Sequence, residues 1–247
     1  MLAGVQITRH TIALVTGSTR GIGAQVARLL AERGATVIGH GRTGGPSARN
    51  IAADLSVPGQ GGELYRSAVG RHGRIDLLVH CAGIGHYGPL ADTAPERTAE
   101  LLAVNLHSVL DLTQAAVTDM TERGRGHLVF VSSIAGLLGV ANEAVYSATK
   151  AGVVGLSEAL RQELAGTGVG VSLVCPGAVR TGFFQGRGAP YDRRFPRPLS
   201  AGAVARSIVS AIEHDRARVV RPRWLAIAPA VQAVTPGGYT RLARRFG

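Results

Sequence analysis

Short apolar runs rich in β-branched residues alternate with longer helical patterns along this chain of 247 residues. The strand-like runs are apolar throughout, which is typical of a parallel sheet buried on both faces. We therefore predict an α/β fold, a single-domain Rossmann-type doubly wound parallel sheet of about seven strands with helices on both faces. The expected strands are 11–16, 35–40, 50–55, 74–81, 126–133, 169–175 and a weak one at 217–220, and the expected helices are 21–33, about 60–72, 95–123, 143–165 and 200–214.

The connection between the second and third strands is unusually short. Residues 41–49 are rich in glycine, whereas a crossover between parallel strands usually needs a dozen or more residues. We expect a loop or a single helical turn there.

Size and composition favour one globular domain spanning residues 1–247. Hydrophobic residues make up 45% of the chain, which is enough to bury a large core. Cys81 and Cys175 each end an apolar run, and their spacing indicates neither a disulfide framework nor a metal site. With no basic and apolar leader and no run of 18 apolar residues, we expect a cytoplasmic protein without a membrane span or metal.

The net charge of +11 raises the question of an anionic partner. Most of the surplus lies from Arg187 onward, where twelve arginines face three acidic residues. The segment lacks a helix-turn-helix, zinc or aromatic RNA-binding pattern, so we expect no nucleic acid. A solvated surface is the simpler interpretation, and attraction of an acidic substrate or carrier is the alternative.

A glycine-rich turn joins the first strand to the first helix. In "TGSTRGIG", Gly17, Gly21 and Gly23 allow a tight turn and close approach of the backbone to a pyrophosphate, which would meet the positive end of the helix. The position between an apolar strand and an amphipathic helix predicts nucleotide binding.

The end of the second strand indicates which nucleotide is bound. An NAD enzyme places a carboxylate there for the ribose 2′-hydroxyl, whereas this chain has "GHGRTGG". Arg42 from this stretch and Arg20 from the glycine turn are suited to embrace a 2′-phosphate. The predicted cofactor is NADP(H).

The chain contains a single lysine, Lys150, and it follows Tyr146 by four residues on a predicted helix. Both side chains then leave one face of the helix, one turn apart. A phenol has a pKa near 10 in water, and a neighbouring ammonium lowers that value toward neutrality, where the phenol can act as an acid–base. Lysine has three donors and is suited to bind a ribose hydroxyl as well.

Two polar residues elsewhere complete this constellation. Ser133 closes the strand before Tyr146 and is placed to donate to a substrate carbonyl at the carboxyl end of the sheet. Asn105, on the long helix at 95–123, is placed to hold a water behind the lysine.

With these motifs in order, the chain resembles the short-chain dehydrogenase/reductase family, in a compact single-domain NADP-dependent branch similar to 3-oxoacyl-carrier-protein reductases. The motifs are "TGSTRGIG", "ADL" at 53–55, "HCAG" at 80–83, "VNL" at 104–106, Ser133, "YSATK" at 146–150 and "CPGAVRT" at 175–181. The resemblance implies that Tyr146 is the general acid–base, that Lys150 lowers its pKa and binds ribose, that Ser133 positions the carbonyl, and that Asn105 completes a proton relay. It also implies that Asp54 and Leu55 contact the adenine. By the same resemblance, Ala82 and Gly83 border the cofactor, and the nicotinamide is lined by Pro176, Gly177 and Thr181. The cofactor set is then Gly17, Ser18, Thr19, Arg20, Gly21, Ile22, Gly23, Arg42, Asp54, Leu55, Ala82, Gly83, Tyr146, Lys150, Pro176, Gly177 and Thr181.

One departure from the family pattern is His80, which stands where the family usually has an asparagine that ties neighbouring strands. We interpret His80 as a structural substitute.

The substrate is less constrained than the chemistry. A lid is expected at about 182–200, where aromatic and basic residues mix with Gly and Pro, and it would suit a hydrophobic or carrier-bound ketone. The segment 221–247 diverges from the family; a helix over the cleft, a subunit contact and a patch on anionic lipid are the three interpretations, of which we favour the first two. His86 and Tyr87 are expected in the pocket wall.

We therefore expect NADPH-dependent reduction of a ketone to a secondary alcohol, or the reverse oxidation. Small residues Ala151, Gly152 and Gly155 beside the catalytic turn favour close pairing of subunits, as a homodimer or homotetramer. The alternative is a non-catalytic NADP(H)-sensing Rossmann protein with a basic C-terminal interaction surface.

Overall fold

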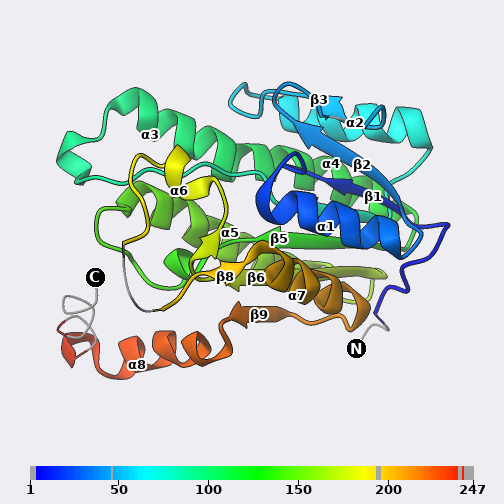
Figure 1. Ribbon diagram of the computed structural model, residues 1–247. Coiled ribbons are helices and arrows are strands. Elements are labelled where there is room, and N and C mark those ends of the chain that lie inside the picture. Colours follow the sequence, from blue (N-terminus) through cyan, green and yellow to red (C-terminus); the bar gives the residue numbers. More distant parts are fainter. Residues whose placement is uncertain (1–3, 46, 193–195, 239–240, 242–247) are drawn as a thin grey trace.

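Seven parallel strands form the central sheet of the computed structural model, which describes residues 4–45, 47–192, 196–238 and 241 (Figure 1). The strand order is β3-β2-β1-β4-β5-β6-β9, and every neighbouring pair is parallel. The predicted sheet is confirmed. The strands are β1 (Ile12–Val15), β2 (Thr36–Gly41), β3 (Ile51–Ala52), β4 (Leu77–His80), β5 (Gly126–Val131), β6 (Val169–Pro176) and β9 (Arg218–Arg221).

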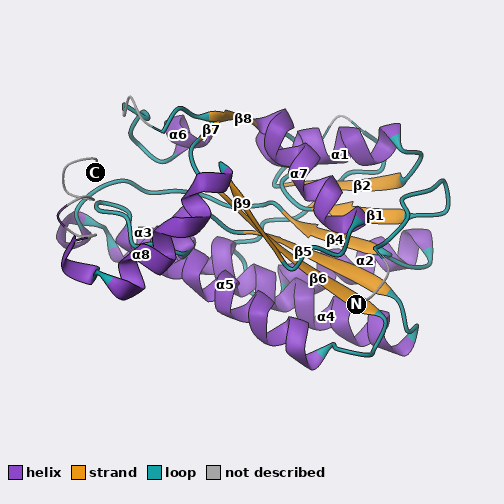
Figure 2. Ribbon diagram, turned by 90° about the horizontal axis from the view of Figure 1, so that it is seen from below, coloured by secondary structure: helices purple, strands orange, loops and turns teal. Residues whose placement is uncertain are grey.

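Helices cover both faces of this sheet (Figure 2). Helices α1 (Gly21–Glu32) and α7 (Ala201–Glu213) pack together on one face. On the other lie α2 (Gln60–His72), α4 (Ser108–Glu122) and α5 (Ala144–Glu163).

Successive strand residues supply the two apolar layers in turn. Leu14 and Leu78 pack toward α2, α4 and α5, whereas Val15 and Val79 pack toward α1 and α7. Since side chains alternate across a strand, a strand that serves two layers must be apolar at every position. This explains the unbroken apolar runs in the sequence.

Two elements differ in detail from the sequence expectations, the third strand and the long helix. The third strand is only two residues long, whereas the described residues of 41–49 contain no helix, as expected of a loop. The helix expected at 95–123 is made of α3 (Pro95–Leu102), a π-helical turn at Ala103–His107, and α4.

The predicted lid contains short elements. A two-stranded ribbon joins β7 (Val179–Arg180) to β8 (Leu199–Ser200), and the short helix α6 (Phe183–Gly186) lies between them. Arg193, Arg194 and Phe195, three of the predicted lid residues, lie outside the described residues.

The C-terminal segment continues past β9 into a 3₁₀ turn at Arg223–Ile227 and helix α8 (Ala228–Val234). This segment lies at the periphery of the molecule beside the edge strand β9 (Figure 1). Residues 239, 240 and 242–247 of the divergent segment lie outside the described residues. In the described part of the chain, no helix is both long enough and apolar enough to cross a membrane.

Candidate active site

A cleft of about 1560 Å³ opens at the carboxyl ends of the strands. It runs from the glycine turn after β1 to the C-terminal segment around Trp224. The strand order reverses between β1 and β4, and ligands of open α/β sheets bind at such a point. Pockets for one drug-sized molecule usually measure about 300–1,000 Å³, so this cleft has room for two ligands side by side.

The glycine turn has the conformation that its residues allow. Gly17 and Gly21 have φ angles of +63° and +59°, in the left-handed region that favours glycine. A Cβ atom at Gly23 would lie 2.3 Å from the Gly17 carbonyl oxygen. No side chain caps the N-terminus of α1, so its first amides are available to an anion. The residues present therefore fit a dinucleotide pyrophosphate.

His40, at the end of β2, holds this turn in place. The Gly17 amide donates to its Nδ1 at 3.2 Å, and its Nε2 lies 3.0 Å from the carbonyl oxygen of Ala53. Both contacts are satisfied when His40 is neutral with its proton on Nε2. Burial lowers the pKa of His40, which favours that neutral form. The sequence analysis missed His40.

Ser18 belongs to the same arrangement. Its hydroxyl donates to the His40 carbonyl at 3.3 Å and accepts from the His40 amide at 2.9 Å. It does not line the cleft, in contrast to the other members of the predicted glycine-turn set.

The part of the cleft next to the carboxyl end of β2 carries two exposed guanidinium groups, those of Arg20 and Arg42. Asp54 and Leu55 line the same region. Hydrogen bonds from Ser56 lower the pKa of the Asp54 carboxyl, and the nearby charge of Arg42 acts in the same direction. This part of the cleft therefore carries the positive charges of Arg20 and Arg42 next to the negative charge of Asp54.

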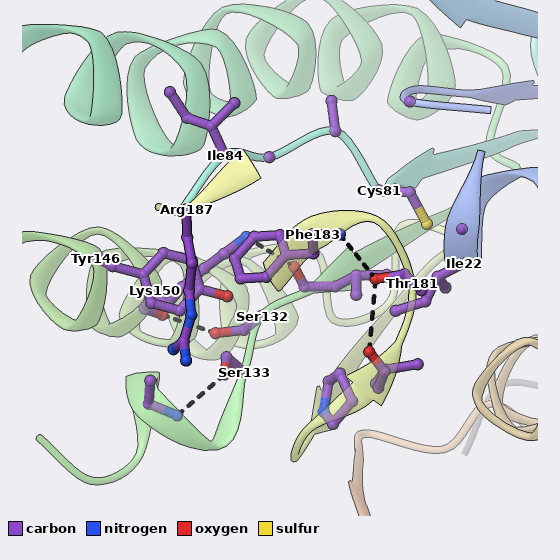
Figure 3. Close-up of a pocket in the computed structure, with 18 of the residues that line it drawn as sticks. Ile22, Cys81, Ile84, Ser132, Ser133, Tyr146, Lys150, Thr181, Phe183 and Arg187 are labelled. Atoms are coloured by element: carbon purple, nitrogen blue, oxygen red, sulfur yellow. Dashed lines mark hydrogen bonds between the residues drawn. The ribbon is translucent and has the colours of Figure 1, made fainter. Parts of the chain in front are cut away.

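Tyr146 lies in the first turn of α5, with 8% of its surface exposed. Its hydroxyl shares a hydrogen bond with Ser133, which follows β5. The Tyr146 ring packs against Phe183 of α6 with 5.5 Å between ring centres. Figure 3 shows Ser133, Tyr146, Lys150 and Phe183 gathered in one pocket.

Lys150 emerges one turn later on α5 and is also buried. Its Nζ donates to the carbonyl oxygen of Val131 at 3.2 Å and lies 5.9 Å from the centre of the Tyr146 ring. Burial lowers the pKa of Lys150 to about 8.

The pKa of Tyr146 differs from the sequence expectation. Burial raises it to about 12, and the hydrogen bond with Ser133 acts in the opposite direction. The expected net lowering by Lys150 is not found: desolvation of the phenolate is the largest cause of the shift, and the lysine charge is not among its causes. Tyr146 is therefore protonated at neutral pH and suited to donate a proton.

Asn105 lies in the π-helical turn between α3 and α4 and is fully buried behind the cleft wall. Its Oδ1 accepts from the Ile84 amide and its Nδ2 donates to the Ile84 carbonyl, each at 2.9 Å. A Cβ atom at Gly83 would lie 3.2 Å from Asn105 Oδ1 and 3.4 Å from Lys150 Nζ, so Asn105 and Lys150 flank the same glycine. Asn105 thus fixes the loop after β4 next to the lysine.

His80 is enclosed by neighbouring elements. Its Nε2 lies 3.2 Å from the Thr113 hydroxyl on α4, and its ring stacks on Phe130 of β5 at 4.9 Å. Burial lowers the pKa of His80 to about 3, and the charge of Lys150 adds to this effect. A neutral side chain that ties β4 to its neighbours is consistent with the structural interpretation.

Arg187 connects the predicted lid segment to the start of α5. Its guanidinium pairs with Glu143, just before α5, and lies 4.8 Å from the ring centres of both Tyr87 and Phe184. Arg187 is 8% exposed. Attraction of an acidic substrate was the alternative to a solvated surface for the arginines of this part of the chain, and the charge of Arg187 is matched by Glu143. In the described part of the lid, Phe183, Phe184 and Tyr191 line the cleft together with Arg187 and Asp192, so the lid presents a mainly aromatic wall.

Most of the predicted site residues line this one cleft. They are Gly17, Thr19, Arg20, Gly21, Ile22, Gly23, Arg42, Asp54, Leu55, Ala82, Gly83, Ser133, Tyr146, Lys150, Pro176, Gly177 and Thr181. Ser18 and Asn105 lie behind the wall. Trp224, Leu225, Ala228 and Gln232 of the C-terminal segment also line the cleft, as one of the three interpretations of that segment predicted.

Comparison with known proteins agrees with this geometry. The family model described as short chain dehydrogenase matches residues 11–192. The ketoacyl reductase HetN of Nostoc sp. (strain PCC 7120) is 34% identical over 98% of this chain and 90% of its own length. A putative ketoacyl reductase of the monensin polyketide synthase from Streptomyces virginiae is 42% identical over 73% of this chain and 77% of its own. A solved 3-ketoacyl-(acyl-carrier-protein) reductase from Brucella melitensis, complexed with NADH, superposes with a TM-score of 0.78 at 25% identity, covering 86% of this chain and 96% of its own.

Proposed function

The chain belongs to the short-chain dehydrogenase family and is an oxidoreductase acting on carbonyl or CH–OH groups, and we propose that it reduces a hydrophobic ketone to a secondary alcohol with NADPH. One observation carries the proposal: Tyr146, Ser133 and Lys150 meet in the cleft that also contains the glycine turn. A protein that only senses a dinucleotide has no need of a buried phenol and ammonium next to its cofactor site.

The proposed step assigns one task to each side chain. NADPH, when bound, supplies the hydride that adds to the carbonyl carbon. The Tyr146 hydroxyl donates its proton to the carbonyl oxygen, which balances the charge that develops there. Ser133 donates a hydrogen bond to the same oxygen and holds it beside the phenol.

Lys150 and Asn105 act behind the phenol in this proposal. Lys150 donates to the cofactor ribose and, as a cation within 5.9 Å of the Tyr146 ring, stabilises the phenolate left after proton transfer. The N-terminus of α5 adds a favourable dipole, since Tyr146 lies in its first turn. Asn105 fixes the loop at Ile84 through two hydrogen bonds to its backbone. In this proposal it also holds the water through which protons reach Lys150.

The choice of NADPH over NADH rests on Arg42 and Arg20. Arg42→Asp should weaken NADP⁺ binding by about 10–100-fold, since a charge-assisted hydrogen bond is replaced by repulsion, and should leave NAD⁺ binding equal or improved. Calorimetric titration of both nucleotides checks this. Arg49→Asp, an exposed arginine outside the cleft, is the matched control. Equal loss in both variants would mean that overall charge, not a phosphate contact, controls affinity.

His40 makes nucleotide binding depend on pH. Protonation of His40 at Nδ1 removes the acceptor for the Gly17 amide. Because the pKa of His40 in the folded protein lies below the ordinary 6.5, this hydrogen bond is lost only as the pH falls through that lowered pKa. Between pH 7.5 and 5, NADP⁺ binding to the wild type should weaken about threefold to tenfold more than binding to His40→Asn, in which an amide supplies an acceptor and a donor without titrating. Both proteins share the titration of the nucleotide phosphate, so the difference isolates His40. Parallel pH profiles would contradict this role.

The class of ketone is inferred from the walls and from the relatives. Ile84, Leu138, Phe183 and Phe184 line the substrate side, and the relatives are called ketoacyl reductases. We therefore propose a β-ketoacyl thioester or a similar hydrophobic ketone. NADPH oxidation should be measured over β-ketoacyl thioesters, polycyclic ketones, sugars and small ketones. Tight NADPH binding without turnover of any ketone, and without NADP⁺ reduction by the matching alcohols, would favour the sensor.

Subunit pairing through α5 stays a prediction. Of the small residues expected at such a contact, Gly152 already packs within the chain, since a Cβ there would lie 3.0 Å from Leu106. Ala151 and Gly155 remain exposed and available.

A further inference from the structure

The C-terminal segment presents its apolar side chains outward. Ile227, Val231 and Val234, spaced as one face of a helix, are 64%, 41% and 81% exposed. Ala226, just before them, and Ala230 and Ala233, between them, are exposed too. Isolated apolar residues are normal on a protein surface, but a contiguous stripe marks a surface that another body covers.

The same segment turns its polar side chain inward. From Trp224 to Val234 the only polar residue besides that tryptophan is Gln232, and it lines the cleft. An ordinary surface helix has the reverse arrangement, with polar residues facing water. The outer face of the segment is therefore apolar where contact with water would favour polar residues, whereas the inner face lines the cleft.

The charge of this part of the sequence indicates what covers the stripe. After Asp215 the sequence contains no acidic residue, whereas it contains Arg216, Arg218, Arg221, Arg223, Arg241, Arg244 and Arg245. Arg218 pairs with Glu158, and Arg221 donates to the Ser207 hydroxyl. Among the described residues of the segment after β9, Arg223, at the start of the 3₁₀ turn, and Arg241 are exposed.

Two bodies are candidates to cover the stripe, a second copy of the chain and an anionic membrane, and these charges distinguish them. A second copy paired about a two-fold axis would bring the same arginine-rich segment, which has no acidic residue of its own after Asp215, against itself. An anionic lipid surface meets both features, because its headgroups attract the arginines and its acyl boundary accepts the aliphatic stripe.

We propose that the outer face of residues 223–234, defined by Ile227, Val231 and Val234 and with the exposed Arg223 at its amino-terminal end, docks on the surface of an anionic membrane. The segment lies in the membrane interface without spanning it, with its inner side still forming the cleft wall. This docking does not depend on the reductase reaction. The cleft lies directly behind the docked segment, and if the proposed function holds, a lipophilic ketone needs only a short path from the lipid.

The test is sedimentation of the full chain with vesicles. Vesicles of equal parts phosphatidylcholine and phosphatidylglycerol should bind the wild type, whereas vesicles of phosphatidylcholine alone should bind it far more weakly. Each arginine near the surface contributes roughly fivefold in affinity, so raised salt should release the protein. The triple variant Ile227→Ser, Val231→Ser, Val234→Ser should lose about tenfold or more of this binding while its melting temperature and turnover of a water-soluble ketone remain unchanged.

Val57→Ser is the matched control, since Val57 is 49% exposed but lies on the loop between β3 and α2. Its vesicle binding should equal that of the wild type. Three results would overturn the proposal: no binding to anionic vesicles, equal binding to neutral vesicles, or a triple variant that keeps its vesicle binding but changes the oligomeric mass. The last of these identifies a second copy as the cover.

Discussion

Replacing Tyr146 with phenylalanine should lower turnover of ketone reduction by about 10²–10⁴-fold, the range expected when a positioned general acid is removed. NADPH affinity should change by less than about threefold, because the hydroxyl serves the reacting oxygen and not the pyrophosphate or the adenosine. Stopped-flow reduction under saturating NADPH gives the first quantity, and a fluorescence titration with NADPH gives the second.

The size of the effect follows from how Tyr146 is surrounded. Its pKa of about 12 keeps the proton on the phenol at neutral pH, and Ser133 is the residue that shares a hydrogen bond with it. The lysine ammonium lies 5.9 Å from the ring centre and donates to a backbone carbonyl. Phenylalanine keeps the ring contact with Phe183 and removes only the proton that the alkoxide needs.

Tyr87→Phe is the matched control in the same cleft. The Tyr87 hydroxyl accepts from the Asn142 amide at 3.2 Å, and its ring lies against Arg187. Its removal should change turnover by only a few-fold. If Tyr146→Phe retained turnover within about tenfold of wild type, or if both variants lost the same activity, the proton would come from another group.

The parallel sheet could be predicted from sequence because its cause is local in the chain. Strands buried on both faces must be apolar at each position, and Leu14 and Val15 satisfy two different layers in succession. The glycine turn could be predicted for a similar reason, since Gly17 and Gly21 adopt conformations that other residues avoid.

The parts that could not be predicted depend on contacts between distant residues. His40 serves the glycine turn only because β2 places its ring between Gly17 and Ala53. Arg187 and Glu143 are 44 residues apart, and nothing local to either indicates that they neutralise each other. The pKa of Tyr146 was predicted with the wrong sign because spacing on a helix reports the neighbouring charge but not the desolvation.

Lys150→Met should make the protein more stable at neutral pH by about 1–3 kcal/mol and abolish most of its turnover, by about 10²-fold or more. The lysine is 6% exposed and donates to the Val131 carbonyl, and no carboxylate of the described residues is among the groups that shift its pKa. Its burial lowers the pKa to about 8 from an ordinary 10.5, so the charged form is disfavoured in the folded state. Methionine fills a similar volume without that cost.

The sign and the pH window of this gain follow from linkage. Below pH 8 the wild-type lysine is charged in both states, and the folded state carries the full cost of burying the cation. Between pH 8 and 10.5 the folded protein releases a proton that the unfolded chain keeps, so wild-type stability rises and the advantage of the variant shrinks. Thermal unfolding at pH 7 and pH 9.5 measures both ends of the window.

Arg161→Met on the same helix is the opposite control. Arg161 pairs with Asp215 at 3.2 Å, and Asp215 is mostly buried, so removing the arginine leaves a carboxylate without this partner and should lower stability. A gain in Lys150→Met and a loss in Arg161→Met would show that the lone lysine is retained at the expense of stability, as expected for a group kept for the reaction. Equal stability losses in both variants would contradict the expected gain and identify Lys150 as a cation stabilised by the Val131 carbonyl, whereas unchanged turnover in Lys150→Met would contradict its catalytic role.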